Sequence, residues 1–289
     1  NWKTESNGIV EEVKQTSDQN LIFISSYKGE KKNNKFYINS ISLNTGITNW
    51  IKETSLIKVI QATEKDNALI LSDGLQKISG LDLKTGANLW ENTLDEKLLL
   101  ANNSSNQTLL LLTYKNLYGI NTSNGRILTK NELPYPNSYV PNYLVELDSS
   151  IFIGGSDGKV IKLSKIFRKP IWKYKTGGSI SSLIITNNRL LVSSFDNFVY
   201  LLNIRNGKLM WKKRMEDRVD IKPIIYNNSA FISSTSGIKV SIIDLSEGKL
   251  INQIQLEEGS YSTGSPLILE SGILLPTNKG LYLYSTKCS

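Results

Sequence analysis

One eleven-residue pattern recurs along the chain at a nearly constant spacing, and this repetition restricts the fold more than any other feature of the sequence. In the copy at residues 80–90, GLDLKTGANLW, an alternating apolar segment reaches a Thr-Gly turn, and a tryptophan follows four residues later. The turn glycine recurs at positions 46, 86, 125, 207 and 248, separated by 40, 39, 82 and 41 residues. A degenerate copy without glycine ends at Trp172 inside the long gap.

A second element repeats independently of the first. It consists of a polar turn pair, one variable residue, three apolar residues and usually a small residue, and it starts at residues 19, 66, 106, 148, 187, 227 and 270. Both elements share a period of about 41 residues, and each period contains four short apolar strands bounded by Asn, Asp, Gly and Ser. This combination predicts an all-β fold, a β-propeller built from four-stranded antiparallel blades in a WD40-like arrangement.

The recurring tryptophan is expected to lie on the outermost strand of each blade. Gly86 provides the positive φ angle of the preceding turn, and the Thr85 hydroxyl is suited to hydrogen bonding with the local backbone. A blade is a small sheet with two apolar faces, and it cannot bury both by itself. We therefore expect Trp90 to pack against the neighbouring blade and to bury apolar surface there.

Counting the repeats predicts seven blades in a single domain that spans residues 1–289. The inner element occurs seven times, but the last unit at residues 264–286 has only three strands. The strand around Trp2 precedes the first inner element, so it is expected to complete the last blade. Such closure of the ring by the N-terminal strand would remove free sheet edges.

Composition excludes several chemistries. The chain contains no histidine, which excludes Ser-His-Asp and Cys-His catalysis and the commonest transition-metal ligand. Cys288 is the single cysteine, so neither an intrachain disulfide nor a thiolate metal cluster forms. The net charge of +8 comes from basic residues scattered among acidic ones, a distribution that does not predict nucleic-acid binding. No apolar run is long enough for a transmembrane segment, and the first residues show no signal-peptide pattern.

The repeated motif resembles the tryptophan-docking motif of the pyrroloquinoline-quinone (PQQ) repeat family, roughly Ala-x-Asp-x-x-Thr-Gly-x-x-x-Trp. Asp82, Thr85, Gly86 and Trp90 match it directly, and the resemblance extends over essentially the whole chain. One branch of this family consists of quinoprotein dehydrogenases that bind PQQ and Ca²⁺. The other branch has no cofactor and includes BamB, a lipoprotein subunit of the outer-membrane β-barrel assembly machinery. No catalytic constellation of the first branch is recognisable, so the resemblance implies the non-enzymatic branch, without a cofactor or a bound metal.

Three groups of residues are candidates for function. Asp82, Asn121, Asn203 and Asp244 precede the turns; they are either calcium ligands or, as we favour because they fall on different blades, caps of their own turns. The segment LPYPNSYVPNY at residues 133–143 contains Tyr135 and Tyr139 and is either a partner-binding surface or a connector between blades. The segment at residues 211–222 contains Arg214, Arg218 and Lys222, which either receive an acidic partner or ligand or are solvated.

These features together predict a non-catalytic scaffold for protein interaction. The resemblance implies an exported, monomeric protein of the bacterial periplasm or outer membrane, with peripheral or lipid-tethered membrane association and partners among outer-membrane assembly components. Two alternatives remain open, a quinoprotein oxidoreductase that depends on PQQ and calcium, and a propeller that binds a small ligand or a glycan. The first predicts a convergent carboxylate cluster, and the second predicts a pocket with an aromatic floor.

Overall fold

Every regular element in the computed structural model is a β-strand, as the repeats predict. The structure describes Lys3 and residues 8–16, 20–28, 34–63, 67–104, 107–133, 139–164, 170–269 and 272–285. In these ranges no helix has the length and apolar character needed to cross a membrane. The chain divides into two compact units, residues 1–133 and residues 134–289, and each is described by itself.

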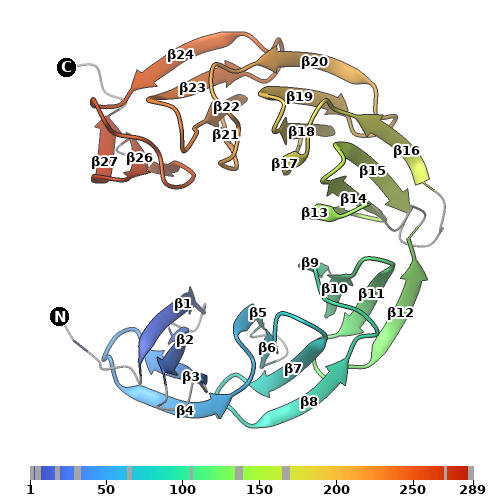
Figure 1. Ribbon diagram of the computed structural model, residues 1–289, viewed down its shortest axis with the longest axis vertical. Helices are drawn as coiled ribbons and strands as arrows, with labels where there is room; N and C mark the ends of the chain where they lie inside the picture. The colour runs from blue at the N-terminus through green and yellow to red at the C-terminus, as the bar shows by residue number, and fades with distance from the viewer. Residues whose placement is uncertain are drawn as a thin grey trace. The chain divides into compact units, whose positions relative to one another are not determined.

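The first unit contains three four-stranded antiparallel sheets. Their strands are β1 (Ile9–Gln15), β2 (Asn20–Lys28), β3 (Asn34–Ser42) and β4 (Thr48–Thr54); β5 (Lys58–Thr63), β6 (Ala68–Ser72), β7 (Lys77–Asp82) and β8 (Asn88–Thr93); and β9 (Leu100–Ser104), β10 (Thr108–Leu112), β11 (Asn116–Asn121) and β12 (Ile127–Glu132). Within this unit the first strands of the sheets lie on the concave side of the row and the fourth strands lie on the convex side (Figure 1).

The second unit contains three further four-stranded sheets and one sheet with three described strands. The first of these sheets consists of β13 (Pro141–Leu147), β14 (Ser150–Gly155), β15 (Lys159–Ser164) and β16 (Pro170–Lys175). The second consists of β17 (Ile180–Thr186), β18 (Arg189–Ser194), β19 (Phe198–Asn203) and β20 (Leu209–Arg214). The third consists of β21 (Ile224–Tyr226), β22 (Ser229–Ile232), β23 (Lys239–Asp244) and β24 (Leu250–Gln255). The last sheet consists of β25 (Leu267–Leu269), β26 (Gly272–Thr277) and β27 (Gly280–Ser285).

The second strand of a sheet is buried on both of its faces, which explains the continuous apolar runs of the repeat. Side chains of a strand alternate between the two faces of a sheet. On β6, Leu69 and Leu71 pack with the first sheet, whereas Ile70 packs with Leu109 and Leu111 of the third. Within each unit, the hydrophobic core is therefore a series of layers between consecutive sheets, and neighbouring sheets shield each other's apolar faces.

The recurring tryptophan docks on the next sheet, as the sequence predicts. Each of the four described indole rings lies against the turn glycine of the following sheet; at Gly207, an added Cβ would stand 2.6 Å from Trp172 Cδ2. Each indole N–H also donates a hydrogen bond to a backbone carbonyl of that sheet: Trp50 to Leu83 (3.1 Å), Trp90 to Thr122 (3.0 Å), Trp172 to Ile204 (3.1 Å) and Trp211 to Leu245 (3.0 Å). Docking thus combines apolar burial with a satisfied polar group.

The turns before these tryptophans have the predicted backbone. The turn glycines at 46, 86, 125, 207 and 248 all have φ of 71°. The Asp82 Oδ1 atom accepts hydrogen bonds from the backbone N–H groups of Lys84 (3.0 Å) and Thr85 (2.8 Å), and Asp244 Oδ1 does the same for Ser246 and Glu247 at 2.8 Å. These side chains therefore cap their own turns, which is the role that the sequence favours.

The all-β antiparallel architecture is confirmed, and the seven repeats correspond to seven described sheets, of which the seventh has three strands. The strand predicted around Trp2 to complete that sheet lies outside the described residues. Closure of a ring therefore stays a prediction.

Two glycines of nearly equal φ allow the docking contact to be separated from backbone strain. Gly207 has φ of 71° and faces Trp172, whereas Gly259 has φ of 70° and its added Cβ would meet only the end of the Lys279 side chain, 3.6 Å from Nζ. We expect Gly259→Ala to lower the free energy of unfolding by about 1–2 kcal/mol, the cost of a left-handed residue. Gly207→Ala should lower it by roughly 2–5 kcal/mol, because the indole must also move. Urea unfolding followed by circular dichroism measures both, and equal losses would contradict the docking argument.

Candidate functional site

The loop at residues 215–223 links β20 to β21 and carries two of the predicted partner-binding cations. The Met215 N–H donates to the Asn197 carbonyl (2.8 Å), which fixes the start of the loop. Val219 and Ile221 are buried, whereas Arg218 before them and Lys222 after them are exposed. The alternation of apolar and charged residues thus anchors the loop in the core and directs its cations to the surface.

Arg218 is held against an aromatic ring. Its guanidinium carbon lies 4.0 Å from the centroid of Phe195, in the turn between β18 and β19. Arg214 ends the outer strand β20, pairs in register with Phe198 and is exposed. In the part of the chain that the structure describes, no ion pair joins Arg214, Arg218 or Lys222 to a carboxylate. These cations therefore keep their charge available for an external anion, and stacking limits the conformations of Arg218.

A carboxylate fixes the middle of the loop. Asp220 accepts hydrogen bonds from the Thr235 N–H (3.0 Å to Oδ1) and from the Thr235 hydroxyl, in the turn between β22 and β23. Burial raises the pKa of the Asp220 carboxyl, but the hydrogen bonds from Thr235 outweigh this effect and hold the pKa below its ordinary value. The end of the loop is held at Lys222, whose carbonyl accepts a hydrogen bond from the Ser265 hydroxyl (2.7 Å).

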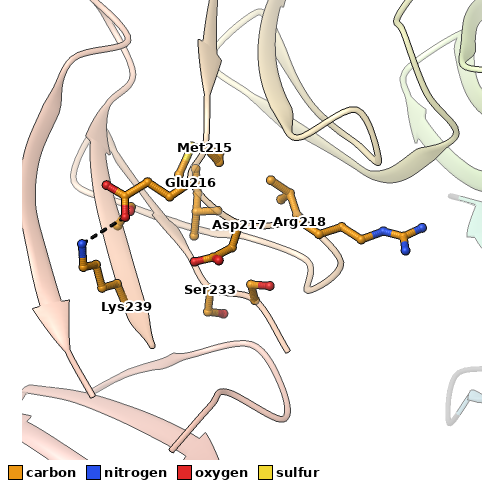
Figure 2. A pocket seen from close by; sticks show the side chains of 10 residues that line it. Met215, Glu216, Asp217, Arg218, Ser233 and Lys239 are labelled. Carbon is orange, nitrogen blue, oxygen red and sulfur yellow. Dashed lines mark hydrogen bonds and ion pairs between the residues drawn. The ribbon is translucent and has the colours of Figure 1, made fainter. Parts of the chain in front are cut away.

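The cavity beneath this loop is small. It is lined by residues 215–219 together with Ile232, Ser233, Ser234, Lys239 and Ser241, and its volume is about 20 Å³. Such a volume admits a water molecule and nothing larger. Figure 2 shows Glu216 turned toward Lys239, with which it forms an ion pair of 3.0 Å, and Arg218 directed away from the cavity. This loop therefore offers a surface for recognition rather than an enclosed site.

Of the two tyrosine candidates, Tyr139 is described by the structure, and it does not join this surface. Tyr135 lies outside the described residues. Tyr139 is 1% exposed, its ring packs on Gly155, and its hydroxyl oxygen lies 3.3 Å from the Lys159 carbonyl oxygen. Residues 133–143 were interpreted either as a partner-binding surface or as a connector. The interior position of Tyr139 fits a connector. Its ring is not accessible to a partner in this structure.

Sequence reasoning did not identify Phe195, Asp220 or Thr235 as parts of the site. The turn FDN at residues 195–197 is readable as a turn, but not as a neighbour of the loop that begins at residue 215. Among the described residues, no group of three or more Asp, Glu, Cys or His side chains is arranged to hold a metal ion. The chemistry available at this surface is therefore charge pairing and stacking.

Comparison with solved structures establishes the type of fold. BamB from Moraxella catarrhalis superposes with a TM-score of 0.70 at 12% identity, over 99% of this chain and 86% of that one. The β-propeller domain of Cps50 (Swd1) from Myceliophteria thermophila gives a TM-score of 0.64 at 13% identity, over 99% and 98% of the two chains. The computationally designed Ika8 protein gives 0.60 at 11% identity, over 96% and 97%. The fold is thus of the β-propeller type.

Sequence comparison gives a family and one partial relative. The tetrathionate hydrolase of Acidithiobacillus ferrooxidans is 25% identical over 114 residues, which are 38% of this chain and 22% of that protein. The chain thus spans less than a quarter of that relative. The family model described as outer membrane protein assembly factor BamB matches residues 116–275, more than half of the chain. The chain therefore belongs to this BamB family of PQQ-repeat propellers.

Proposed function

We propose that this protein is a non-catalytic scaffold that presents the loop at residues 215–223 to an acidic protein partner. The observation that carries the proposal is the exposed Arg218, stacked on Phe195 at 4.0 Å and joined to no carboxylate among the described residues. Arginine is over-represented among the residues that dominate protein interfaces, and a guanidinium that is already ordered loses little entropy on binding. Arg214 and Lys222 extend the same basic surface at either end of the loop.

The charge distribution supports an acidic partner. Residues 134–289 contain 19 Lys and Arg against 12 Asp and Glu, so most of the net positive charge belongs to the second unit. The outer strands β16 and β20 carry Lys173, Lys175, Lys212, Lys213 and Arg214 and no acidic residue. A field of one sign accelerates association with a partner of the opposite sign and lowers affinity for partners of the same sign.

The scaffold holds this surface in place through bonds between the inner ends of its sheets. Asn142 Nδ2 donates to the Ser179 hydroxyl (2.8 Å), and the Ser181 hydroxyl donates to the Val219 carbonyl at the loop itself. The Ser265 hydroxyl then joins the last sheet to Lys222. A surface fixed in this way pays little conformational entropy when it binds.

The family supports a place for the protein in the cell envelope. The matching family model is named for outer membrane protein assembly, and the BamB of Moraxella catarrhalis shares the fold. We infer that this chain acts as an exported, monomeric, lipid-tethered or peripheral protein of the periplasm and outer membrane. Its partners would be components of outer-membrane protein assembly.

One observation favours a second function. The partial match to tetrathionate hydrolase places an enzyme among the relatives of this sequence, although the matched segment is only 22% of that enzyme. Turnover of tetrathionate, or dye reduction that depends on added PQQ and calcium, would favour this enzymatic function over the scaffold.

Neutralising the loop cations should release the partner. We expect Arg218→Gln with Lys222→Gln to lower capture of the envelope partner by about tenfold or more, because charge-assisted pairs contribute about 1.5–3 kcal/mol. The matched control is Arg126→Gln with Lys84→Gln, which removes the same charges from exposed turns of the first unit. Affinity capture from envelope extracts with quantitative mass spectrometry measures the effect. Equal capture by both double variants would contradict the proposed surface.

Acid should destabilise the loop at residues 215–223, because folding lowers the pKa of the Asp220 carboxyl group. A group whose pKa is lower in the folded chain contributes stability above its unfolded pKa of about 3.9, and this contribution is lost as the pH falls through the folded value. We expect Asp220 to titrate below about 3.9 and to move upward in Thr235→Val, which lacks the hydroxyl donor. Carbon-detected NMR titration of the carboxyl groups measures both values. An unchanged Asp220 titration in the variant would contradict the clamp.

We further propose that the seven sheets are the blades of one closed ring and one domain, completed by the N-terminal strand around Trp2. In the third strands β7, β11, β15, β19 and β23 the central apolar side chains are mostly buried. On the third strand of the last sheet, β27, Leu281 is 71% exposed and Leu283 is 52% exposed. These leucines occupy positions that a fourth strand and a further sheet would cover.

Removing the proposed closing strand should therefore expose β27. In a chain that starts at residue 8, we expect the outward-facing amides of β27 to exchange with deuterium faster than in the full chain, because they would lose their hydrogen-bond acceptors. The amides of β19 serve as the internal control. Unchanged exchange along β27 would show that another segment, or none, pairs with this edge.

A further inference from the structure

The first unit contains an aliphatic pocket that the proposed function does not use. It has a volume of about 520 Å³ and lies where the starts of β5 and β9, on the concave side of the unit, meet the turn between β6 and β7 (Figure 1). Its apolar lining comes from Val59, Ile60, Leu98, Leu99, Leu100 and Ala101. Pockets that hold small molecules are commonly about 300–1,000 Å³, so this one has the size of a ligand site, and its lining is partly apolar and partly polar.

The polar backbone around this pocket is satisfied internally. The Leu98 N–H donates to the Leu75 carbonyl (2.6 Å), the Leu99 N–H to the Leu112 carbonyl (2.8 Å) and the Ile57 N–H to the Ser72 carbonyl (2.9 Å). These three N–H groups are therefore not available to a ligand. The aliphatic part of the surface continues outside the lining, since Leu75 is 56% exposed and Ile57 is 41% exposed. Ile57 also lies over Gly74 of the lining, where an added Cβ would stand 3.5 Å from Ile57 Cδ1.

Two exposed lysines, Lys58 and Lys97, also line the pocket, and neither forms an ion pair with a described residue. The acids nearby are already engaged. Glu96 accepts hydrogen bonds from the Thr113 hydroxyl and the Lys115 N–H, both at 2.9 Å. Asp73 Oδ1 accepts them from the N–H groups of Leu75 (2.7 Å) and Lys77 (3.0 Å). The pocket thus combines an aliphatic wall with positive charge that the described chain does not neutralise.

We propose that this pocket binds a single-chain amphiphile with an anionic head group, of the fatty-acid type. The hydrocarbon chain would lie along the leucines of residues 98–100 and on Ile60, and the head group would pair with Lys58 and Lys97. An anion without a chain would leave the apolar wall exposed, and a neutral chain would leave the lysines unpaired. The lining contains no aromatic residue, which separates it from the aromatic-floored pocket expected of a glycan-binding propeller.

Fluorescence titration with dansyl-undecanoate tests this assignment on the full chain. Binding to the wild-type protein should weaken about tenfold or more in Lys58→Gln with Lys97→Gln, because a charge-assisted pair is lost. Ala101→Trp should abolish binding by filling the pocket. Dodecanol should displace the probe with the same affinity from the wild type and from the lysine double variant, because it has no charge.

The controls separate this site from a general effect of charge or folding. Lys84→Gln with Arg126→Gln removes two exposed cations of the same unit and should leave probe binding unchanged. Circular dichroism verifies that each variant is folded. No binding by the wild type, equal binding by the two charge-removing double variants, or full binding by a folded Ala101→Trp protein would overturn the assignment. Binding to phosphatidylglycerol vesicles that persists in Ala101→Trp, without binding of the soluble probe, would likewise overturn it in favour of a membrane surface.

Discussion

The structure depends on one contact, the packing of a tryptophan ring on the turn glycine of the next sheet. A single four-stranded sheet has two apolar faces and no means of covering both. The turn glycines have φ of 71°, and the ring occupies the space where a Cβ would be. The indole N–H pairs with a carbonyl of the same neighbouring sheet, at 3.0 Å for Trp90 and Thr122. The glycine turn of one repeat therefore forms the surface on which the tryptophan of the previous repeat packs.

The repeats predicted this contact because every part of it is local and recurs in register. Positive φ at glycine, alternation along a strand and a ring four residues later are all properties of a short segment. The same reasoning identified the turn caps, since Asp82 binds the backbone only two and three residues away. Where a repeat lacks the docking tryptophan, other contacts hold the neighbouring sheets together. Asn252 stands in the tryptophan position of β24 and is exposed, and there Phe231, Val240 and Leu256 pack with Ile273 and Leu275 instead.

The candidate site was less predictable because it depends on turns that meet across different sheets. The sequence marked Arg218 as a cation near the start of a sheet, but nothing within one period states that the turn at Phe195 lies beside it. Tyr139 illustrates a second limit. Its aromatic, proline-rich surroundings left a partner-binding surface and a connector both open, and in the structure Gly155 leaves room for its ring in the interior. This glycine, at a position where no other repeat has glycine, was the signal that could have located the ring.

The docking contact also explains why the same scaffold can carry two surfaces of different chemistry. Because the tryptophans act on the convex side of each unit and at the turns before the outer strands, the loops between sheets are not needed to hold the sheets through that contact. One such loop is fixed by Asp220 and presents Arg218 to solvent. Another, at residues 94–99, contributes Lys97 and two leucines to an aliphatic pocket. A few loop residues set the charge of the loop at residues 215–223 and the apolar character of the pocket beside residues 94–99. The repeats fix the backbone on which these residues stand. Both proposed recognition surfaces are therefore formed by loops, and the repeat supplies the rigidity that would make each loop selective.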